Sequence, residues 1–446
     1  MAAPWWLVEP VCLAWDLLRA LARILFDEAL AAAGLHPPQL PPLSKAALGR
    51  CDARSRALLG ALTGREVATM RSAPPDGIVG DAAAGTERLW LRVVWADEAA
   101  AAARARAAAP DPASVPPPSE CALFVKLPSE RLWLRAFLTF PGLYANEARF
   151  YASIAPAIPP SLLPRLHAST CQRSRFAIVL HDLKAAPAPA RLYNLTEELP
   201  AAELEPVLLA LAKLHAAFWD RPHAAWSEAN RPPFYRAIMH AVLTAVRAKH
   251  ATALPAHAEA LFRRFVQRYD AVRAAWNEGP LCLVHGDCHL GNCFVRSGGD
   301  GGAPPSVGFY DWQVVSAEQP MRDVAYLLHL SADPAVLEAH ERRLVGVYLA
   351  ALGAALAAAP APSAGAKRRA RAPSEAEAWE AYRLHALYSL LAFVLTSGAG
   401  DFVLDSQVVA SMSRRCVGAC VRLDARGALE AAIARHDRRG ADKAKA

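Results

Sequence analysis

A polar loop between short apolar strands constrains the fold of this chain more than any other feature. The loop lies within LCLVHGDCHLGNCFV, residues 281–295, and a further apolar run, VGFYD, ends at Asp311. Short apolar runs bounded by polar and turn-forming residues are typical of buried strands. The pattern therefore predicts strands at 281–284, 292–295 and 307–311, with the polar side chains in the loops that follow them.

The two halves of the chain differ in pattern. In the first half, aromatic and β-branched runs predict strands at 88–97, 122–128 and 176–183, and apolar spacing predicts a helix at 143–155. After Leu199 helical periodicity dominates. Because 446 residues exceed the length of a single core, we expect an α+β fold of two lobes. The N-terminal lobe would be a mixed sheet with one helix, and the larger C-terminal lobe would be mainly helical.

Two segments rich in Ala and Pro interrupt this layout, and neither can bury enough apolar surface to fold alone. The basic run KRRAR at 367–371 resembles a nuclear-import signal, although such a run in a linker is usually only solvated. The predicted organisation is a helical extension at 1–70, an N-lobe at 71–183 with an insert at 99–120, a C-lobe at 184–433 with an insert at 357–375, and a disordered tail at 434–446.

Charge and cysteine content narrow the class of partner and the compartment. The formal net charge of +7 is mild for this length and the basic residues are dispersed, so we expect no nucleic-acid partner. Nine cysteines without a CxxC pair indicate reduced thiols, which predicts a cytoplasmic protein without structural disulfides.

Residues 11–28 have the pattern of an amphipathic helix. Polar residues recur three or four positions apart, at Asp16, Arg19, Arg23 and Asp27, and so form one stripe. Together with Glu9, these charges interrupt the apolar N-terminus too often for a membrane span. Two alternatives stay open: a helix docked on the body of the protein, or a helix in contact with a membrane surface.

The polar loop allows a metal interpretation and a phosphotransfer interpretation. His285, Cys288, His289 and Cys293 are the residue types that bind zinc, but all lie within nine residues without a second, separated pair, which disfavours a closed zinc site. The alternative uses Asp287 and Asn292, which are five positions apart on one loop.

Phosphoryl transfer needs these residue types. A carboxylate accepts the proton of the attacking hydroxyl, and an amide oxygen and a second carboxylate hold magnesium near the phosphates. Asp287 and Asn292 supply the first two groups, and Asp311 at the end of its strand supplies the third.

These motifs resemble the superfamily of aminoglycoside phosphotransferases, choline kinases and ecdysteroid-kinase-like proteins, whose fold is related to that of protein kinases. VHGDCHLGNCFV resembles the catalytic loop, FYDWQVVSAEQPMRDVAYLL the metal-binding strand with its following helix, and LAKLHAAFW the helix that supports the loop. The resemblance implies that Asp287 is the catalytic base, that Asn292 and Asp311 bind magnesium, and that Asp323 braces the loop. Asp323 also suits the ordinary place of an acid at a helix N-terminus, and His285 is expected to order the loop by hydrogen bonding.

The N-terminal half should then bind ATP. Lys126, flanked by apolar residues, needs a partner for its charge, and Glu147 is expected to hold it for the phosphates. The resemblance also implies a hinge where backbone groups of Leu180, His181 and Asp182 contact adenine, although His181 stands where an acidic residue is expected. Gly80 and Gly85 of GDAAAGTE would cover the phosphates, or form an ordinary turn.

The resulting hypothesis is an ATP- and magnesium-dependent kinase that phosphorylates the hydroxyl of a small-molecule alcohol. Residues 379–430 contain equal numbers of acids and arginines, so a strongly anionic acceptor pocket is not expected. The alternative is a nucleotide-binding pseudokinase or scaffold without transfer activity. Protein kinase activity is disfavoured, because no Ala-Pro-Glu motif follows Asp311. Five aromatic side chains could pack an apolar alcohol or the core: Trp379, Tyr382, Tyr388, Phe393 and Phe402.

Overall fold

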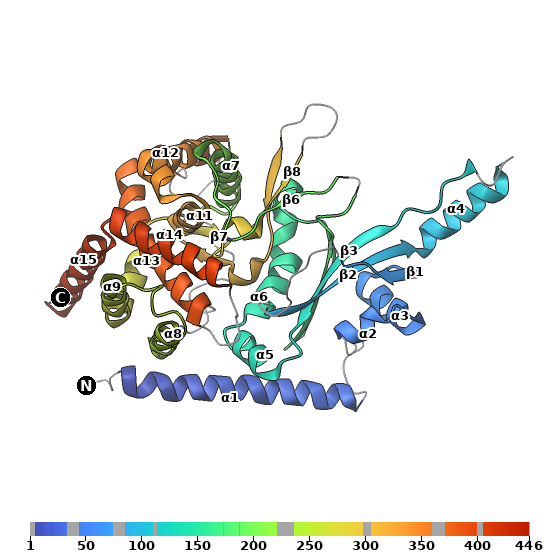
Figure 1. The fold of residues 1–446 in the computed structure, drawn as a ribbon, viewed down its shortest axis with the longest axis horizontal. Helices are drawn as coiled ribbons and strands as arrows, with labels where there is room; N and C mark the ends of the chain where they lie inside the picture. Colours follow the sequence, from blue (N-terminus) through green and yellow to red (C-terminus); the bar gives the residue numbers. More distant parts are fainter. Residues whose placement is uncertain are drawn as a thin grey trace. The chain divides into compact units, whose positions relative to one another are not determined.

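The chain forms two compact units, one built on a sheet and one mainly helical (Figure 1). The structure is a computed structural model, and it describes residues 5–33, 44–74, 85–109, 114–172, 174–186, 188–220, 236–297, 305–358, 371–398 and 405–445. The sheet unit consists of Ala14–Ala190, and the helical unit consists of Met1–Leu13 with Arg191–Ala446. The predicted α+β class is confirmed.

The sheet unit is built on five antiparallel strands in the order β1-β2-β3-β5-β4. Its strands are β1 Val67–Ser72, β2 Thr86–Trp95, β3 Cys121–Pro128, β4 Leu166–Gln172 and β5 Arg175–His181. Three of them, β2, β3 and β5, match the strands that the sequence predicts. The other two were not expected, because β4 has no buried residue and β1 has only two, so neither has a clear apolar pattern.

The two faces of this sheet have different roles. Side chains alternate along a strand, so Leu123, Val125 and Leu127 of β3 share one face and Lys126 lies on the other. The first face, called the core face below, packs against Leu48 and Leu59 of two short helices. These helices are α2 Lys45–Gly49 and α3 Ala53–Thr63. The opposite face is called the lysine face.

The remaining helices of this unit connect the strands. The predicted helix at 143–155 is α6 Leu143–Arg149, and it continues as a π turn at Phe150–Ile154 and a 3-10 turn at Ala155–Ala157. Within the predicted low-complexity insert, residues up to Ala108 belong to a helix without buried side chains. That helix is α4, Ala96–Ala108. The sheet unit also contains α5, Leu132–Thr139, and a 3-10 turn at Pro160–Leu162.

The amphipathic N-terminal helix is present as α1, Trp5–Ala32, but its polar residues do not form one exposed stripe. Arg19 and Arg23 are exposed, whereas Asp27 is buried and accepts hydrogen bonds from the backbone and hydroxyl of Ser174. Several large apolar side chains of α1 are instead exposed, including Trp15 at 62% and Phe26 at 56%. The part of α1 that belongs to the sheet unit therefore packs on it partly through an acidic side chain.

The helical unit contains nine of the described helices and two small sheets. The first sheet pairs β7 Cys282–Val284 with β10 Ser316–Glu318, and the second has the order β6-β8-β9. Its strands are β6 Arg191–Leu192, β8 Cys293–Arg296 and β9 Ser306–Phe309. The helices are α7 Ala201–Ala217, α8 Arg236–Lys249, α9 Ala256–Gln267, α10 Tyr269–Trp276, α11 Met321–Ser331, α12 Pro334–Ala358, α13 Glu375–Gly398, α14 Ser406–Arg422 and α15 Ala425–Lys445.

The end of the chain corrects one prediction. Residues 434–445, predicted to lie in a disordered tail, continue α15 as far as Lys445. Arg268 bonds to Asp437, and Arg439 bonds to Glu278 at 2.6 Å. Ion pairs with the body of the unit therefore hold a segment whose composition alone suggests disorder.

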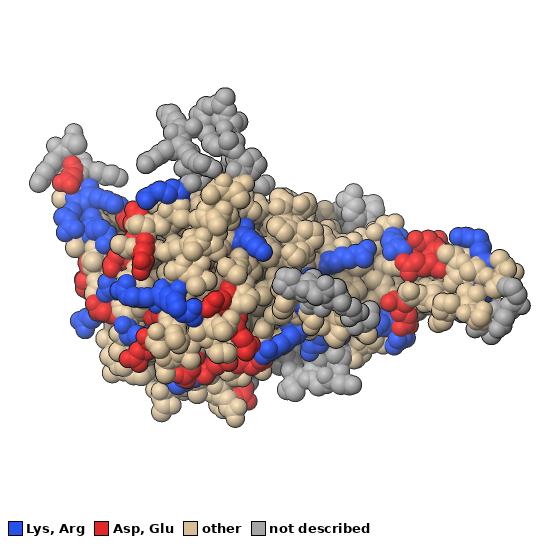
Figure 2. Space-filling view, turned by 90° about the horizontal axis from the view of Figure 1, so that it is seen from above, with Lys and Arg blue, Asp and Glu red and all other residues tan. Residues whose placement is uncertain are grey.

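Charged side chains are spread over the surface. On the face seen in Figure 2, basic and acidic residues lie among one another and do not form a stripe of one sign. Many are paired within the helical unit, as Arg264 is with Glu430 and Arg383 with Asp424. None of the described helices is both long enough and apolar enough to cross a membrane.

Candidate active site

The polar loop is anchored by Asp323, which lies in the first turn of α11 and is fully buried. Its carboxylate accepts hydrogen bonds from the backbone amides of His285 at 2.6 Å and Gly286 at 2.8 Å. Burial alone would raise the pKa of Asp323, but the hydrogen bonds from His215 and from the Gly286 amide outweigh it, so the pKa is lowered. A buried carboxylate thus fixes the loop backbone.

A second layer of contacts holds Asp323 itself. His215 of α7 contacts the Asp323 carboxylate through Nε2 at 3.2 Å, and its Nδ1 lies 2.8 Å from the Tyr348 hydroxyl. The arrangement is satisfied when Tyr348 donates to Nδ1 and Nε2–H donates to Asp323. His215 therefore extends the network from α12 to the loop.

His285 orders the loop through both ring nitrogens. Nδ1 accepts the backbone N–H of Asp287 at 3.3 Å, so Nε2 carries the proton and donates to the carbonyl of Tyr310 at 2.9 Å. Burial lowers the pKa of His285, which agrees with a neutral ring. The histidine thereby ties the loop to the residue before Asp311.

Gly286 is required by the backbone. Its φ of 82° lies in the left-handed region, and a Cβ there would stand 2.3 Å from the carbonyl oxygen of Val314. The Gly286 carbonyl accepts the Tyr388 hydroxyl at 2.6 Å, and the Arg322 guanidinium bonds to the same hydroxyl at 2.6 Å. Sequence reasoning did not single out Arg322, because the two residues that it contacts beside the loop, Gly286 and Tyr388, lie 36 and 66 positions away.

Asp287 and Asn292 meet on the loop. Asn292 Nδ2 donates to the backbone oxygen of Asp287 at 2.9 Å and to its carboxylate at 3.2 Å. His289 Nε2 lies 3.7 Å from the other carboxylate oxygen, and the Asp287 side chain keeps 25% of its exposure. Tyr326 also bonds to the Asp287 carboxylate. Burial, together with the negative charge of Asp287, raises the pKa of the Tyr326 hydroxyl. Asp287 is thus oriented by side chains while staying open to solvent.

Strand pairing brings Asp311 to the same end of the small sheet. β8 begins directly after Asn292, and its first residue, Cys293, pairs with Phe309 of β9. The backbone N–H of Tyr310 then donates to Asn292 at 3.0 Å, one residue before Asp311. Asp311 has φ 65° and ψ 63°, a left-handed conformation that costs energy in a residue other than glycine and often marks a functional site.

The zinc alternative for this loop finds no geometric support. Among the residues that the structure describes, one group of His, Cys, Asp and Glu side chains meets around a common point, and it does not include His285, Cys288, His289 or Cys293. His285 is bonded to backbone groups on both sides. Cys288 and Cys293 are fully buried.

In the sheet unit, Lys126 and Glu147 form a close ion pair. Lys126 Nζ of β3 lies 2.6 Å from Glu147 Oε2 of α6, and the two side chains are only 6% and 4% exposed. A buried ammonium needs such a partner. The pair holds the ammonium of Lys126 in a fixed position on the lysine face of the sheet.

The other predicted nucleotide-binding residues lie on or near β3 and its neighbours β2 and β5. Leu180 pairs with Phe124, so it shares the lysine face, whereas His181 pairs with Leu123 and its side chain lies on the core face. Asp182 is buried and lies 3.5 Å from Arg92. Gly85 accepts the Tyr144 hydroxyl through its carbonyl, and Gly80 lies outside the described residues.

The aromatic residues near the C-terminus belong mainly to the core. Tyr382 and Phe393 are fully buried, and Tyr382 donates to Glu341 at 2.7 Å. Trp379 stacks on Tyr382 and carries Arg342 over its ring. Phe402 lies outside the described residues. The core alternative therefore fits Tyr382 and Phe393, while Tyr388 supports the loop.

Three solved structures resemble the chain at low sequence identity. A choline/ethanolamine kinase family protein from Mesorhizobium loti is 17% identical, with coverage of 75% of this chain and 98% of that chain and a TM-score of 0.40. Choline kinase from Cryptosporidium parvum Iowa II is 8% identical, with coverage of 81% and 91% and a TM-score of 0.41. An aminoglycoside-3'-phosphotransferase of type VIII is 17% identical, with coverage of 76% and 96% and a TM-score of 0.35.

Family membership rests on a stronger finding, because those TM-scores are low. No curated protein matches the sequence. The sequence model of the ecdysteroid kinase-like family matches residues 116–360, a segment that contains Lys126, Asp287, Asn292 and Asp311. Since this segment is more than half of the 446 residues, the chain belongs to the ecdysteroid kinase-like family.

Proposed function

We propose that this protein transfers the γ-phosphoryl group of ATP, with magnesium, to the hydroxyl of a small-molecule alcohol. The proposal rests mainly on the hydrogen bond between Asn292 and the Asp287 carboxylate. Both residues lie on a loop whose backbone is fixed by the buried Asp323. A buried carboxylate and a neutral histidine fix the loop that carries the partly exposed Asp287, and the strained backbone of Asp311 is of a kind that clusters at functional sites. Membership of the ecdysteroid kinase-like family supports the same class of reaction.

The residues of the helical unit fit a magnesium ion. Mg²⁺ prefers oxygen ligands and usually takes one or two carboxylates. The Nδ2 group of Asn292 is engaged by Asp287, so Oδ1 is the amide atom that can bind a cation. Asp311, at the same end of the β8 and β9 pair, would supply the carboxylate.

The residues of the sheet unit fit phosphate groups. In this proposal Lys126 binds the outer phosphates, and Glu147 holds the ammonium in place. Backbone groups of Leu180, His181 and Asp182, at the end of β5, would contact adenine. The neighbourhood of Gly85 would cover the phosphates, as Gly80 would from outside the described residues.

The reaction then depends mainly on positioning. Mg-ATP, when bound, would supply the electrophilic phosphoryl group, and its magnesium would neutralise the developing charge. Asp287 would accept the hydroxyl proton at its carboxylate as the new O–P bond forms and the bond from the γ-phosphorus to the leaving ADP breaks. Asn292 and His289 restrict that carboxylate, and Asp323 and His285 restrict the loop, so the base is held in place before the acceptor binds.

Charge pairing narrows the acceptor class. Acids near the C-terminus are paired with arginines: Glu380 and Asp424 share Arg383, and Glu430 pairs with Arg264. Kinases of polycationic acceptors would be expected to keep such acids for the ligand. The proposed acceptor is therefore an uncharged or weakly charged alcohol.

Product formation tests this proposal. Purified protein with Mg-ATP is incubated with panels of sterol-like alcohols, amino alcohols such as choline, and aminoglycosides, and ADP and phosphorylated acceptor are measured. We expect acceptor-dependent ADP formation with an uncharged or weakly charged alcohol. ATP binding without acceptor-dependent ADP formation across all panels would instead favour a nucleotide-binding scaffold.

A further inference from the structure

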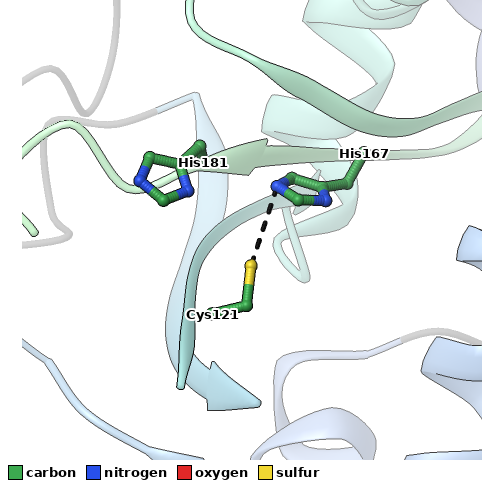
Figure 3. A group of neighbouring side chains, drawn as sticks. All are labelled: Cys121, His167 and His181. Atoms are coloured by element: carbon green, nitrogen blue, oxygen red, sulfur yellow. Dashed lines mark hydrogen bonds between the residues drawn. The ribbon is translucent and has the colours of Figure 1, made fainter. Parts of the chain in front are cut away.

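Three metal-ligating side chains from three different strands meet on the core face of the sheet unit. They are Cys121 at the start of β3, His167 near the start of β4 and His181 at the end of β5 (Figure 3). One ligand atom from each lies within 4.8 Å of the others, and Cys121 Sγ lies 3.9 Å from His167 Nε2. All three side chains are partly exposed.

Strand register explains why they meet. His181 pairs with Leu123, and Cys121 lies two residues before Leu123 on the same face. The register of β4 against β5 shifts between Leu166 and Ala168, so His167 is the extra residue of a β-bulge. A bulge re-aims one side chain, and here His167 reaches toward Cys121 at the neighbouring end of β3, as the dashed line in Figure 3 indicates.

The surroundings keep the imidazole of His167 available as a ligand. Its ring stacks on the buried Trp95 with centroids 6.3 Å apart, which fixes its orientation. Burial, reinforced by the charges of Arg165 and Arg65 and by His181, lowers the pKa of His167 to about 4. The ring is therefore neutral near pH 7, and neutral imidazole is the form that binds metals.

We propose that Cys121, His167 and His181 form a zinc site, with the fourth coordination position filled by water. Thiolate and imidazole together select Zn²⁺ over Mg²⁺ or Ca²⁺, which prefer oxygen ligands. Three protein ligands with one open position is an arrangement that zinc adopts.

The distances are within reach of that geometry. Zinc bonds of about 2.0–2.3 Å place tetrahedral ligand atoms about 3.3–3.6 Å apart. In the structure, Cys121 Sγ and His167 Nε2 are 3.9 Å apart, and all three ligand atoms lie within 4.8 Å of one another. Side-chain rotation would bring them to zinc-binding distances without a change in strand register. Burial raises the pKa of the Cys121 thiol, so binding releases its proton to solvent as the sulfur–zinc bond forms.

The zinc site uses the side chain of His181 on the core face, whereas the proposed adenine contact uses the backbone of the same residue. Cys121 and His181 lie on the core face, whereas Lys126 lies on the lysine face of the same sheet. The zinc would join the ends of β3, β4 and β5. Its binding can therefore be measured without reference to phosphotransfer activity.

Metal titration of the full chain tests the proposal. Zn²⁺ is titrated by calorimetry, and Co²⁺ is added as a spectroscopic substitute, because a cysteine ligand gives a thiolate-to-cobalt charge-transfer band. The variants are Cys121→Ser and His167→Ala. The matched control is Cys171→Ser, since Cys171 is a partly exposed thiol on β4 of the same sheet.

The expected result is one equivalent of Zn²⁺ bound by the wild type and by Cys171→Ser, with the charge-transfer band present in both. Cys121→Ser should lose the band. Cys121→Ser and His167→Ala should both bind Zn²⁺ at least about 100-fold more weakly than the wild type. Replacing a residue that only hydrogen-bonds to a metal ligand costs no more than about 100-fold in metal affinity. Thermal melts without metal establish that the variants fold. The proposal is overturned if the wild type takes up no zinc, or if folded Cys121→Ser keeps the band.

Discussion

Replacing Asp287 with asparagine is expected to lower turnover by a factor of about 10² to 10⁴ while leaving the fold intact. The change removes the group that accepts the hydroxyl proton but keeps the size of the side chain. The Asp287 side chain is partly exposed, and its contacts are hydrogen bonds with Asn292 and Tyr326 and an approach by His289. Steady-state rates of ADP formation, with thermal melts alongside, measure both effects.

A second aspartate provides the matched control. Asp270 lies in the same unit, is 69% exposed and pairs with Arg236 at 3.0 Å. Asp270→Asn makes the same chemical change away from the loop, so its turnover should stay within about twofold of the wild type, as is usual for surface substitutions. Equal turnover in Asp287→Asn and the wild type would remove Asp287 from the role of base.

Replacing Asp323 with alanine is expected to lower the free energy of unfolding by about 3–5 kcal/mol. The substitution removes the acceptor of two buried loop amides and of His215. Those donors lie in the interior, so each carries a desolvation cost once its acceptor is removed. Denaturant unfolding at pH 7 gives the difference, and Asp270→Ala, at an exposed position, should stay within about 0.5 kcal/mol of the wild type.

The ionisation of Asp323 should also make the stability of the protein depend on pH. The pKa of Asp323 in the folded protein lies below its ordinary value of 3.8, so its contribution to stability is fully present above that value. The contribution is lost as the pH falls through the lowered pKa of the folded state. The stability gap between the wild type and Asp323→Ala should therefore persist at pH 7 and shrink below pH 3.8. A gap under 1 kcal/mol at pH 7 would contradict the bracing role.

Local pattern predicted the parts of the site that depend on adjacent residues. Asp287 and Asn292 lie five positions apart, and their strands are apolar enough to be recognised, so the loop was visible in the sequence. Lys126 stood out because a charge within an apolar strand needs a partner, and the structure joins it to Glu147.

What could not be predicted depends on register and on long-range contact. Strand β4 carries partly exposed side chains and gave no periodic signal. His167 lies 46 positions after Cys121 and 14 positions before His181. Only the bulge at His167 brings its ring toward Cys121. Arg322 and Tyr388 support the Gly286 carbonyl from α11 and α13. No spacing rule links such residues before the helices are packed.

Thermal stability with and without Mg-ATP tests the central claim most directly, because it needs no knowledge of the acceptor. A ligand that binds only the folded state stabilises it by about 2.7 kcal/mol at a hundred times its dissociation constant. We expect a rise in melting temperature of the wild type that requires magnesium and that Asp311→Ala loses. An unchanged melting temperature in the wild type, or an equal rise in Asp311→Ala, would contradict it.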